Sequence, residues 1–160
     1  MKVFRILLFS GIFLLCSCII EPYEIKTTDY LIFGHFYGEC RGEGCIEMFK
    51  IENEMLYEDE NDTYPTSTDF YNAKWKVLDK TKYEEVKNLT EFIPKKLLND
   101  NNRIIGQPDA GDWGGIYIEI KIGDTHKFWL MDKMRSNVPK EYHEFLNKVE
   151  EKINLLQNTQ

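Results

Sequence analysis

The sequence predicts a single α+β domain built on an antiparallel β-sheet with helices packed on one face. Strand-like segments near residues 46–57 and 116–131 each predict a hairpin, and a segment with apolar residues at helical spacing follows each of them. The order is therefore hairpin, helix, hairpin, helix. Helices on one face of an antiparallel sheet are the simplest arrangement for that order.

The first half of the domain is predicted to contain three strands and an acidic turn. Residues 30–37 are rich in aromatic and branched side chains, which are typical of a strand. Residues 46–51 and 55–57 follow as two strands joined by a tight polar turn. The acidic segment 58–62 lacks the glycine and the closing glutamate of an EF-hand loop, so we expect a solvated turn there.

The middle of the chain is predicted to pass from a short strand at 75–78 into a helix. Asp79 is the expected N-cap, because its carboxylate can accept hydrogen bonds from the free amides of the first turn. Pro94 is expected to end this helix or to begin a new turn that runs through Leu98. The apolar residues between them have three- and four-residue spacing and would share one helical face: Tyr83, Val86, Leu89 and either Ile93 or Phe92.

A second hairpin is predicted in the C-terminal third. Isoleucines alternate with Tyr117, Glu119 and Lys121, which predicts a half-buried strand with the isoleucines toward the core. Gly123-Asp124 suits a two-residue hairpin turn, after which residues 127–131 would return as the partner strand.

The last predicted element is a helix that begins at Pro139, because proline is favoured in the first turn of a helix. Its apolar residues recur at helical spacing and would form one buried stripe: Tyr142, Phe145, Leu146, Val149, Ile153 and Leu156. Its charged residues would lie mostly on the solvated side: Lys140, Glu141, Glu144, Lys148, Glu151 and Lys152.

The N-terminal residues have the pattern of an export signal. Two basic residues precede an apolar run over residues 6–15, and the small residue Ser17 stands just before Cys18. This pattern resembles the signal peptide of bacterial lipoproteins, in which a diacylglycerol is attached to the cysteine and the chain is cut in front of it. The resemblance implies that residues 1–17 are removed and that Cys18 carries acyl chains such as palmitate.

Other interpretations of this segment fit less well. A transmembrane anchor would need about 20 apolar residues, whereas residues 6–20 are fewer and are interrupted by Ser10 and Gly11. A plain secretory signal would need an Ala-like pair beside the cut, which the sequence lacks. Cys16 is a second candidate for the lipid, but the residue before it, Leu15, is bulky.

Cleavage leaves a tether over residues 18–29 and a single domain over residues 30–158. Removal of 17 of the 160 residues leaves 143, and the loss of Lys2 and Arg5 changes the formal net charge from −7 to −9. Because phosphate binding needs basic side chains, nucleic acid is not an expected partner. Anionic headgroups would also repel the chain, so we expect it to bind the membrane through its N-terminal lipid.

Cys40 and Cys45 remain as a pair once Cys18 is assigned to the lipid. An even pair in an exported chain predicts a disulfide. The alternatives are a metal site that also uses His35, or a redox pair. Structural zinc normally has four ligands and a redox pair is usually separated by two residues, so neither alternative is favoured, and no metal or cofactor is predicted.

Residues 106–115 combine two carboxylates, four glycines and a tryptophan just before a strand. They predict a candidate ligand-binding loop, in which Asp109 and Asp112 supply oxygens to a cation or a polar ligand and Trp113 stacks on a sugar or a peptide. The alternative is a type I turn over residues 108–111, followed by a bulged entry into the strand.

The chain as a whole resembles the small, uncharacterised lipoproteins common in Bacteroidetes. The resemblance rests on the lipoprotein signal, on the segment Phe33-Gly-His-Phe-Tyr-Gly-x-Cys40 with its paired cysteine, and on the segment 106–115. It implies a place in the cell envelope and no particular activity. No nucleophile motif, P-loop or dinucleotide fingerprint occurs in the sequence.

The leading functional hypothesis is a non-enzymatic, lipid-anchored binding module with a protein or glycan partner. Ile19 rather than aspartate follows Cys18, so nothing favours retention in the inner membrane, and the outer membrane is the expected location. One alternative is a metal-dependent or carbohydrate-active hydrolase that uses Asp109, Asp112 and His35. Another is an inhibitor or immunity protein whose acidic surface matches a basic partner.

Overall fold

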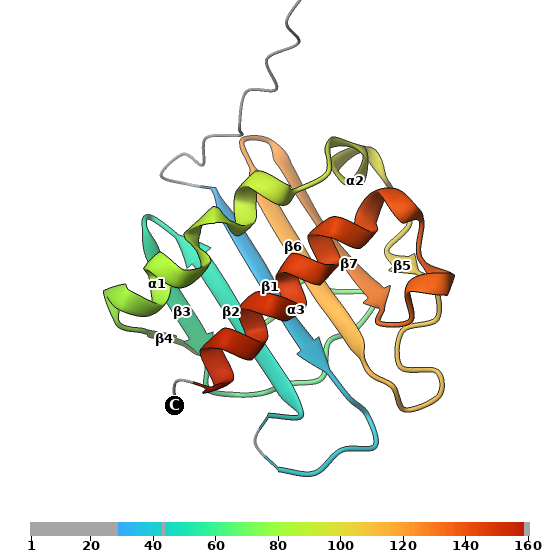
Figure 1. Cartoon of the computed structure of the whole chain (residues 1–160), viewed down its shortest axis with the longest axis horizontal. Helices are drawn as coiled ribbons and strands as arrows, with labels where there is room; N and C mark the ends of the chain where they lie inside the picture. The colour runs from blue at the N-terminus through green and yellow to red at the C-terminus, as the bar shows by residue number, and fades with distance from the viewer. Residues whose placement is uncertain (1–28, 43, 159–160) are drawn as a thin grey trace, which may run out of the picture.

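The predicted α+β class is confirmed by the computed structural model, which describes residues 29–42 and 44–158. One sheet has the strand order β4-β3-β2-β1-β6-β7-β5 (Figure 1). The strands are β1 (Tyr30–Phe36), β2 (Ile46–Glu52), β3 (Met55–Asp59), β4 (Trp75–Val77), β5 (Ile104–Ile105), β6 (Gly115–Ile122) and β7 (Thr125–Asp132). The predicted signal peptide, Cys18 and most of the tether lie outside the described residues.

The sheet is mixed, whereas the sequence predicted an antiparallel one. β5 pairs parallel with β7, with Ile104 opposite Leu130 and Ile105 opposite Met131. The other neighbouring strands pair antiparallel. β5 escaped prediction because two residues are too few to show an alternation of apolar and polar side chains. On its outer edge, β7 is therefore paired only near its C-terminal end.

Helices cross one face of this sheet, as Figure 1 shows for α1 and α3. The helical elements are α1 (Lys80–Val86), η1 (Lys87–Phe92), α2 (Lys95–Asn99), η2 (Arg135–Asn137), η3 (Lys140–Tyr142) and α3 (His143–Asn158). The main core lies beneath them and includes the predicted isoleucines of β6, Ile116, Ile118 and Ile120. In the described part of the chain, no helix is long and apolar enough to span a membrane.

The predicted C-terminal helix is present, but α3 begins at His143 and not at Pro139, which has a non-helical backbone and precedes the short η3. The six predicted apolar residues are buried, with Tyr142 in η3 and the other five in α3. Lys152 is an exception to the predicted pattern, because its side chain lies at the edge of the core and the residue is only 8% exposed. Its Nζ donates to the backbone oxygen of Glu85 at 2.6 Å. The lysine therefore packs its apolar stem against the core and links α3 to α1.

The helix predicted from Asp79 onward is divided into α1 and the tighter η1. At the junction, Val86 has φ −117°, which departs from regular α-helical geometry. Thr90 then directs its hydroxyl to the backbone oxygen of Lys87 at 3.4 Å, a local bond of the kind that competes with helix formation. Asp79 occupies the N-cap position, but its carboxylate makes no capping hydrogen bond, so that part of the prediction is wrong.

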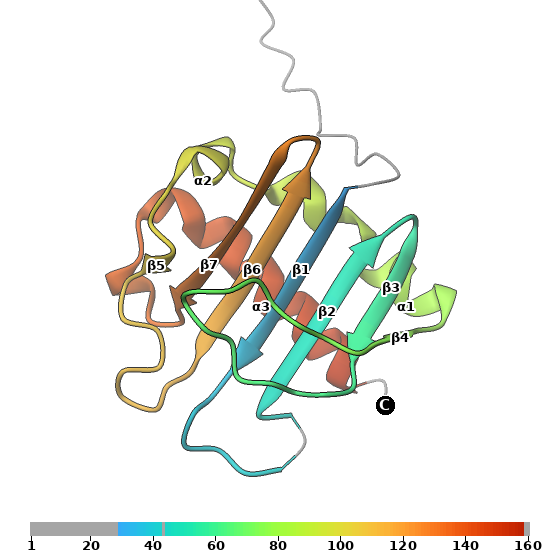
Figure 2. The same cartoon turned by 180° about the vertical axis from the view of Figure 1, so that it is seen from behind.

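The second face of the sheet is covered by residues 60–74, which we call the strap (Figure 2). The ring of Tyr64 packs edge-on against Phe36 with centroids 5.1 Å apart, and Tyr71 lies 5.5 Å from Tyr117. A smaller apolar cluster lies on this face: Ile32, Phe36, Met48, Tyr117, Phe128 and Leu130. The central strands β1 and β6 are therefore buried on both faces.

Two acidic residues that the sequence placed in solvent are buried on this second face. Asp59 is 4% exposed, and its carboxylate accepts hydrogen bonds from the Tyr71 hydroxyl at 2.8 Å and the Lys74 amide at 2.7 Å. Glu119 is 1% exposed. The turn over residues 58–62, which was expected to be solvated, therefore holds the strap through Asp59. In β6 the alternating side chains point to two faces of the sheet, and both faces are buried.

Candidate functional site

The predicted ligand loop lies at one end of the sheet, and its first carboxylate holds that end together. Asp109 Oδ2 accepts hydrogen bonds from the Gly38 amide at 2.7 Å and the Tyr64 hydroxyl at 2.9 Å. Its Oδ1 accepts the Gly114 amide at 3.0 Å. Asp109 therefore joins three segments: its own loop, the chain after β1 and the strap. The structure uses this carboxylate as a structural acceptor.

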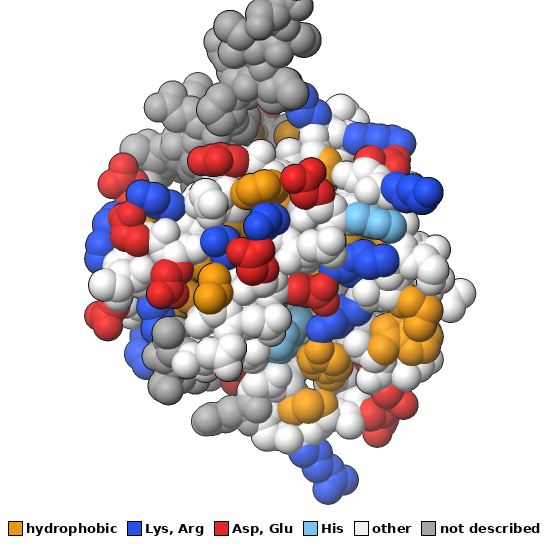
Figure 3. Space-filling model, viewed as in Figure 1, with side chains coloured by type: hydrophobic (Ala, Val, Ile, Leu, Met, Phe, Trp, Pro, Cys, Tyr) orange, Lys and Arg blue, Asp and Glu red, His pale blue; other side chains and the backbone are white. Residues whose placement is uncertain are grey.

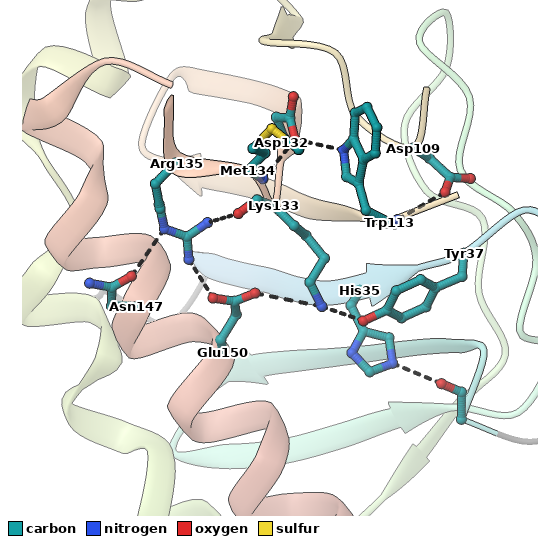
Figure 4. A network of polar contacts seen from close by, with 12 residues as sticks. His35, Tyr37, Asp109, Trp113, Asp132, Lys133, Met134, Arg135, Asn147 and Glu150 are labelled. Carbon is teal, nitrogen blue, oxygen red and sulfur yellow. Dashed lines mark hydrogen bonds and ion pairs between the residues drawn. The ribbon is translucent and has the colours of Figure 1, made fainter. Parts of the chain in front are cut away.

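Trp113 is fixed by a second acidic residue, which sequence analysis did not select. Its indole Nε1–H donates to Oδ1 of Asp132 at 2.8 Å (Figure 4). Asp132 is fully buried and also accepts the Met134 amide at 2.7 Å, the Gln107 amide at 2.9 Å and the Asn137 side-chain amide at 2.8 Å. Burial raises the pKa of this carboxyl, but these donors outweigh it and hold the pKa below its usual value.

Asp112 and His35 do not join Asp109 in a shared cluster. Asp112 is exposed, with φ +60°, and the turn before it closes from the Ala110 amide to the Gln107 carbonyl, one residue earlier than predicted. The His35 ring is within hydrogen-bonding distance of the Gly44 carbonyl, with Nε2 2.9 Å from the oxygen, and burial lowers its pKa. Within residues 29–42 and 44–158, no three His, Cys, Asp or Glu side chains gather closely enough to hold a metal ion.

The predicted disulfide between Cys40 and Cys45 is present, with the two Cα atoms 5.6 Å apart. It closes the loop between β1 and β2 at the same end of the sheet as Asp109. Two basic side chains at this end are paired: Lys133 lies 3.5 Å from Glu150 and also contacts the Tyr37 hydroxyl, and Arg135 contacts the same glutamate (Figure 4). Neither Lys133 nor Arg135 is therefore an uncompensated cation that could bind an anionic ligand.

A cavity of about 220 Å³ lies beside the other half of β7. Side chains from three separate segments line it: Phe70 of the strap, Asp100, Asn101 and Arg103 before β5, and His126, Lys127, Phe128 and Trp129 of β7. On the helix face, basic and acidic side chains are interspersed without a broad area of one sign (Figure 3). The cavity is therefore the more specific candidate for a binding site.

The wall of this cavity includes an unpaired stretch of strand edge. The Leu130 amide donates to the Arg103 carbonyl at 2.8 Å, so Leu130 directs its backbone groups outward, toward β5. Because alternate residues of a strand direct their backbone groups to the same side, His126 and Phe128 do the same. Their outward N–H and C=O groups have no partner among the described residues. This free stretch is the open edge of β7.

A buried carboxylate positions His126 at the cavity. Glu119 Oε1 lies 2.9 Å from His126 Nε2 and accepts the Tyr30 hydroxyl at 2.8 Å. Its Oε2 accepts the Tyr117 hydroxyl at 2.6 Å and the Tyr71 amide at 3.1 Å. Burial and the nearby charge of Glu119 raise the pKa of both phenols, so they stay protonated as donors. The same carboxylate thus binds the strap and orients the histidine.

Aromatic and cationic groups complete the rim. Phe70 stacks on the His126 ring at 3.7 Å between centroids, and 41% of Phe70 remains exposed. The guanidinium of Arg103 lies 4.7 Å from the Phe128 ring centroid, and its Nη1 donates to the carbonyls of Ser67 and Thr68 at 3.4 and 2.8 Å. Its Nε and Nη2 have no partner among the described residues.

Sequence analysis missed this site because its residues belong to no local motif. Phe70 lies in a polar segment, Arg103 in a loop and His126 beside a hairpin turn. Only the folded sheet brings the three together. Comparison with known proteins adds no further evidence, since neither a protein-family model nor a curated protein matches the chain.

Proposed function

We propose that this chain is a lipid-anchored binding protein of the bacterial cell envelope, a docking module and not a catalyst. It binds an extended segment of a partner protein at the open edge of β7. One observation carries the proposal: among the described residues, the outward backbone N–H and C=O groups of His126 and Phe128 have no partner, and both residues line the cavity. Free edge groups of this kind accept an added strand from another chain.

The side chains around the edge support a protein ligand. Main-chain hydrogen bonds would supply affinity, and flanking pockets would select alternate side chains of the bound segment. The exposed face of Phe70 offers one apolar contact, and Arg103 offers one cationic contact. Asp109, the carboxylate expected to serve a hydrolase, is engaged by three donors instead, which favours binding over catalysis.

Replacing Phe70 with alanine is expected to weaken peptide binding by roughly tenfold, since aromatic anchors dominate such contacts. The lipidated protein in detergent micelles would be screened against an array of random hexapeptides, and the best binders would be measured by fluorescence anisotropy. Met55→Ala is the matched control, because Met55 has nearly the same exposure, 40%, and lies toward the opposite edge of the sheet.

A second signature would identify strand addition itself. Only alternate amides of an added strand face β7, so N-methylation should abolish binding at every second peptide position and be tolerated between them. Failure of all hexapeptides to bind in a Phe70-dependent manner, or an N-methyl scan without alternation, would contradict the proposed mode of binding.

The anchor has its own test. We expect Cys18→Ala to give an unlipidated protein that no longer partitions into the detergent phase, because acyl chains contribute about 0.8 kcal/mol for each buried CH₂ group. Cys16→Ala is the matched control and should partition like the natural chain. The reverse result would assign the lipid to Cys16, and partitioning by both variants would remove the lipid anchor from the proposal.

A further inference from the structure

We infer that the open edge of β7 recognises the free carboxyl terminus of the bound peptide, and that Arg103 binds its carboxylate. This inference rests on the proposed function and specifies its ligand. Three features of the cavity carry it: where the open edge ends, the charge placed at that end, and the size of the space.

The open edge is blocked at one end by the protein itself. The Arg103 carbonyl already accepts the Leu130 amide, and β5 continues alongside Leu130 and Met131. A strand added beside His126 and Phe128 cannot run on past this point without displacing β5. The bound chain must therefore turn away or end at Arg103. A cavity of about 220 Å³ is smaller than the roughly 300–1,000 Å³ of drug-sized pockets, and it suits a chain end.

Charge decides which end of the peptide lies there. Arg103 carries a positive charge at the blocked end, which attracts an α-carboxylate and repels an α-ammonium group. The other cationic side chain, Lys127, is engaged by the carbonyls of Leu98 and Asp100 and by the Asn101 side chain. The Asp100 carboxylate is occupied as well, since it accepts the Tyr142 hydroxyl and the Asn102 amide.

Arg103 is also held in a fixed position before any ligand binds. Its Nη1 donates to two strap carbonyls and its guanidinium carbon lies over the Phe128 ring. Among the described residues, Nε and Nη2 remain as an adjacent pair of free donors. Two adjacent guanidinium N–H groups match the two oxygens of a carboxylate. With its carboxylate at Arg103, the peptide would run parallel to β7, in the direction that β5 already has.

The test compares each array hexapeptide as a free acid and as a C-terminal amide, attached through its N-terminus. For the natural chain we expect the acid to bind at least about tenfold more tightly than the amide, as for other hydrogen bonds to charged groups. Arg103→Gln should bind acid and amide within about twofold of each other. Lys76→Gln, which removes an exposed positive charge from the opposite edge strand β4, should keep the full preference.

The outcomes separate this inference from the proposed function. Equal binding of acid and amide by the natural chain, with Phe70 still required, overturns carboxylate recognition and leaves strand addition standing. Retention of the preference by Arg103→Gln overturns the assignment of the carboxylate to Arg103. Absence of any Phe70-dependent peptide binding overturns both. The acid-to-amide ratio of the natural chain tests carboxylate recognition without depending on the folding of any variant.

Discussion

Replacing Asp132 with alanine is expected to lower the free energy of unfolding by about 3–5 kcal/mol, near the upper end for a single substitution. The carboxylate is fully buried and accepts four hydrogen bonds. Its removal would leave the Trp113 indole and the amides of Gln107 and Met134 without their acceptor. The loop before β6 would then lose its attachment to the end of β7.

Urea unfolding followed by circular dichroism would measure this loss. Asp124→Ala is the matched control, because Asp124 lies exposed in the β6–β7 turn and should change the stability by less than about 0.5 kcal/mol. A loss below about 1 kcal/mol for Asp132→Ala would contradict the role given to this carboxylate.

The Asp132 carboxyl should also contribute to the pH dependence of the free energy of unfolding. Its folded-state pKa lies below the usual value, so the stability it contributes is present above the unfolded-state pKa of about 3.9. That contribution is lost as the pH falls through the folded-state pKa. Asp132→Asn, which cannot ionise, should therefore lose less stability between neutral and acidic pH than the natural chain does.

Replacing Glu119 with alanine is the second large effect that we expect, a loss of about 3–5 kcal/mol. Glu119 gathers Tyr30, Tyr117 and His126 around one buried carboxylate and accepts the Tyr71 amide of the strap. Without the carboxylate, the buried Tyr117 hydroxyl and the half-buried Tyr30 hydroxyl would lose this acceptor. The strap would lose one of its principal attachments to the sheet.

Limited proteolysis would detect that release, because Lys74 at the end of the strap becomes a more accessible trypsin site as the strap detaches. Glu119→Gln keeps one acceptor oxygen and should cost less, about 1–2 kcal/mol. Glu91→Ala, an exposed glutamate in η1, is the matched control and should behave like the natural chain. Unchanged strap proteolysis in Glu119→Ala would contradict the anchoring role of this residue.

The elements that local sequence patterns could predict are those with a regular period or a strong local signal. Alternation marked β6, three- and four-residue spacing marked α3, and Gly123-Asp124 marked the two-residue turn between β6 and β7. The Cys40–Cys45 pair was predictable from parity and short spacing. In each case the determining residues are close together in the sequence.

The second buried face could not be predicted in this way. The strap has no periodic apolar pattern, because it is held by individual contacts to Asp59, Asp109 and Glu119 rather than by a continuous stripe. An acidic residue that alternates with isoleucines has the same local pattern whether water or a strap covers it. Only partners far away in the sequence, such as Tyr30 and Tyr71, distinguish the two cases.

The candidate site illustrates the same limit. Asp109 and Trp113 belong to a loop whose composition is typical of ligand-binding loops. In the structure, both side chains are hydrogen-bonded to other parts of the protein. Arg103 and Phe70 had no such local signature. Their relevance comes from the shortness of β5, which begins only opposite Leu130, and from the unpaired part of β7 before it. These are properties of strand register and not of residue type.

The central position of β1 has a consequence for how the chain folds. β1 is the first strand along the chain, and β2 can pair with it early, but its other neighbour, β6, comes much later, with Tyr30 opposite Lys121. Closing such a long loop costs entropy before any contact compensates for it, which slows folding. Until then the β1 side of the half-formed sheet presents an unsatisfied edge. The period before β6 arrives is therefore when the chain is most exposed to aggregation.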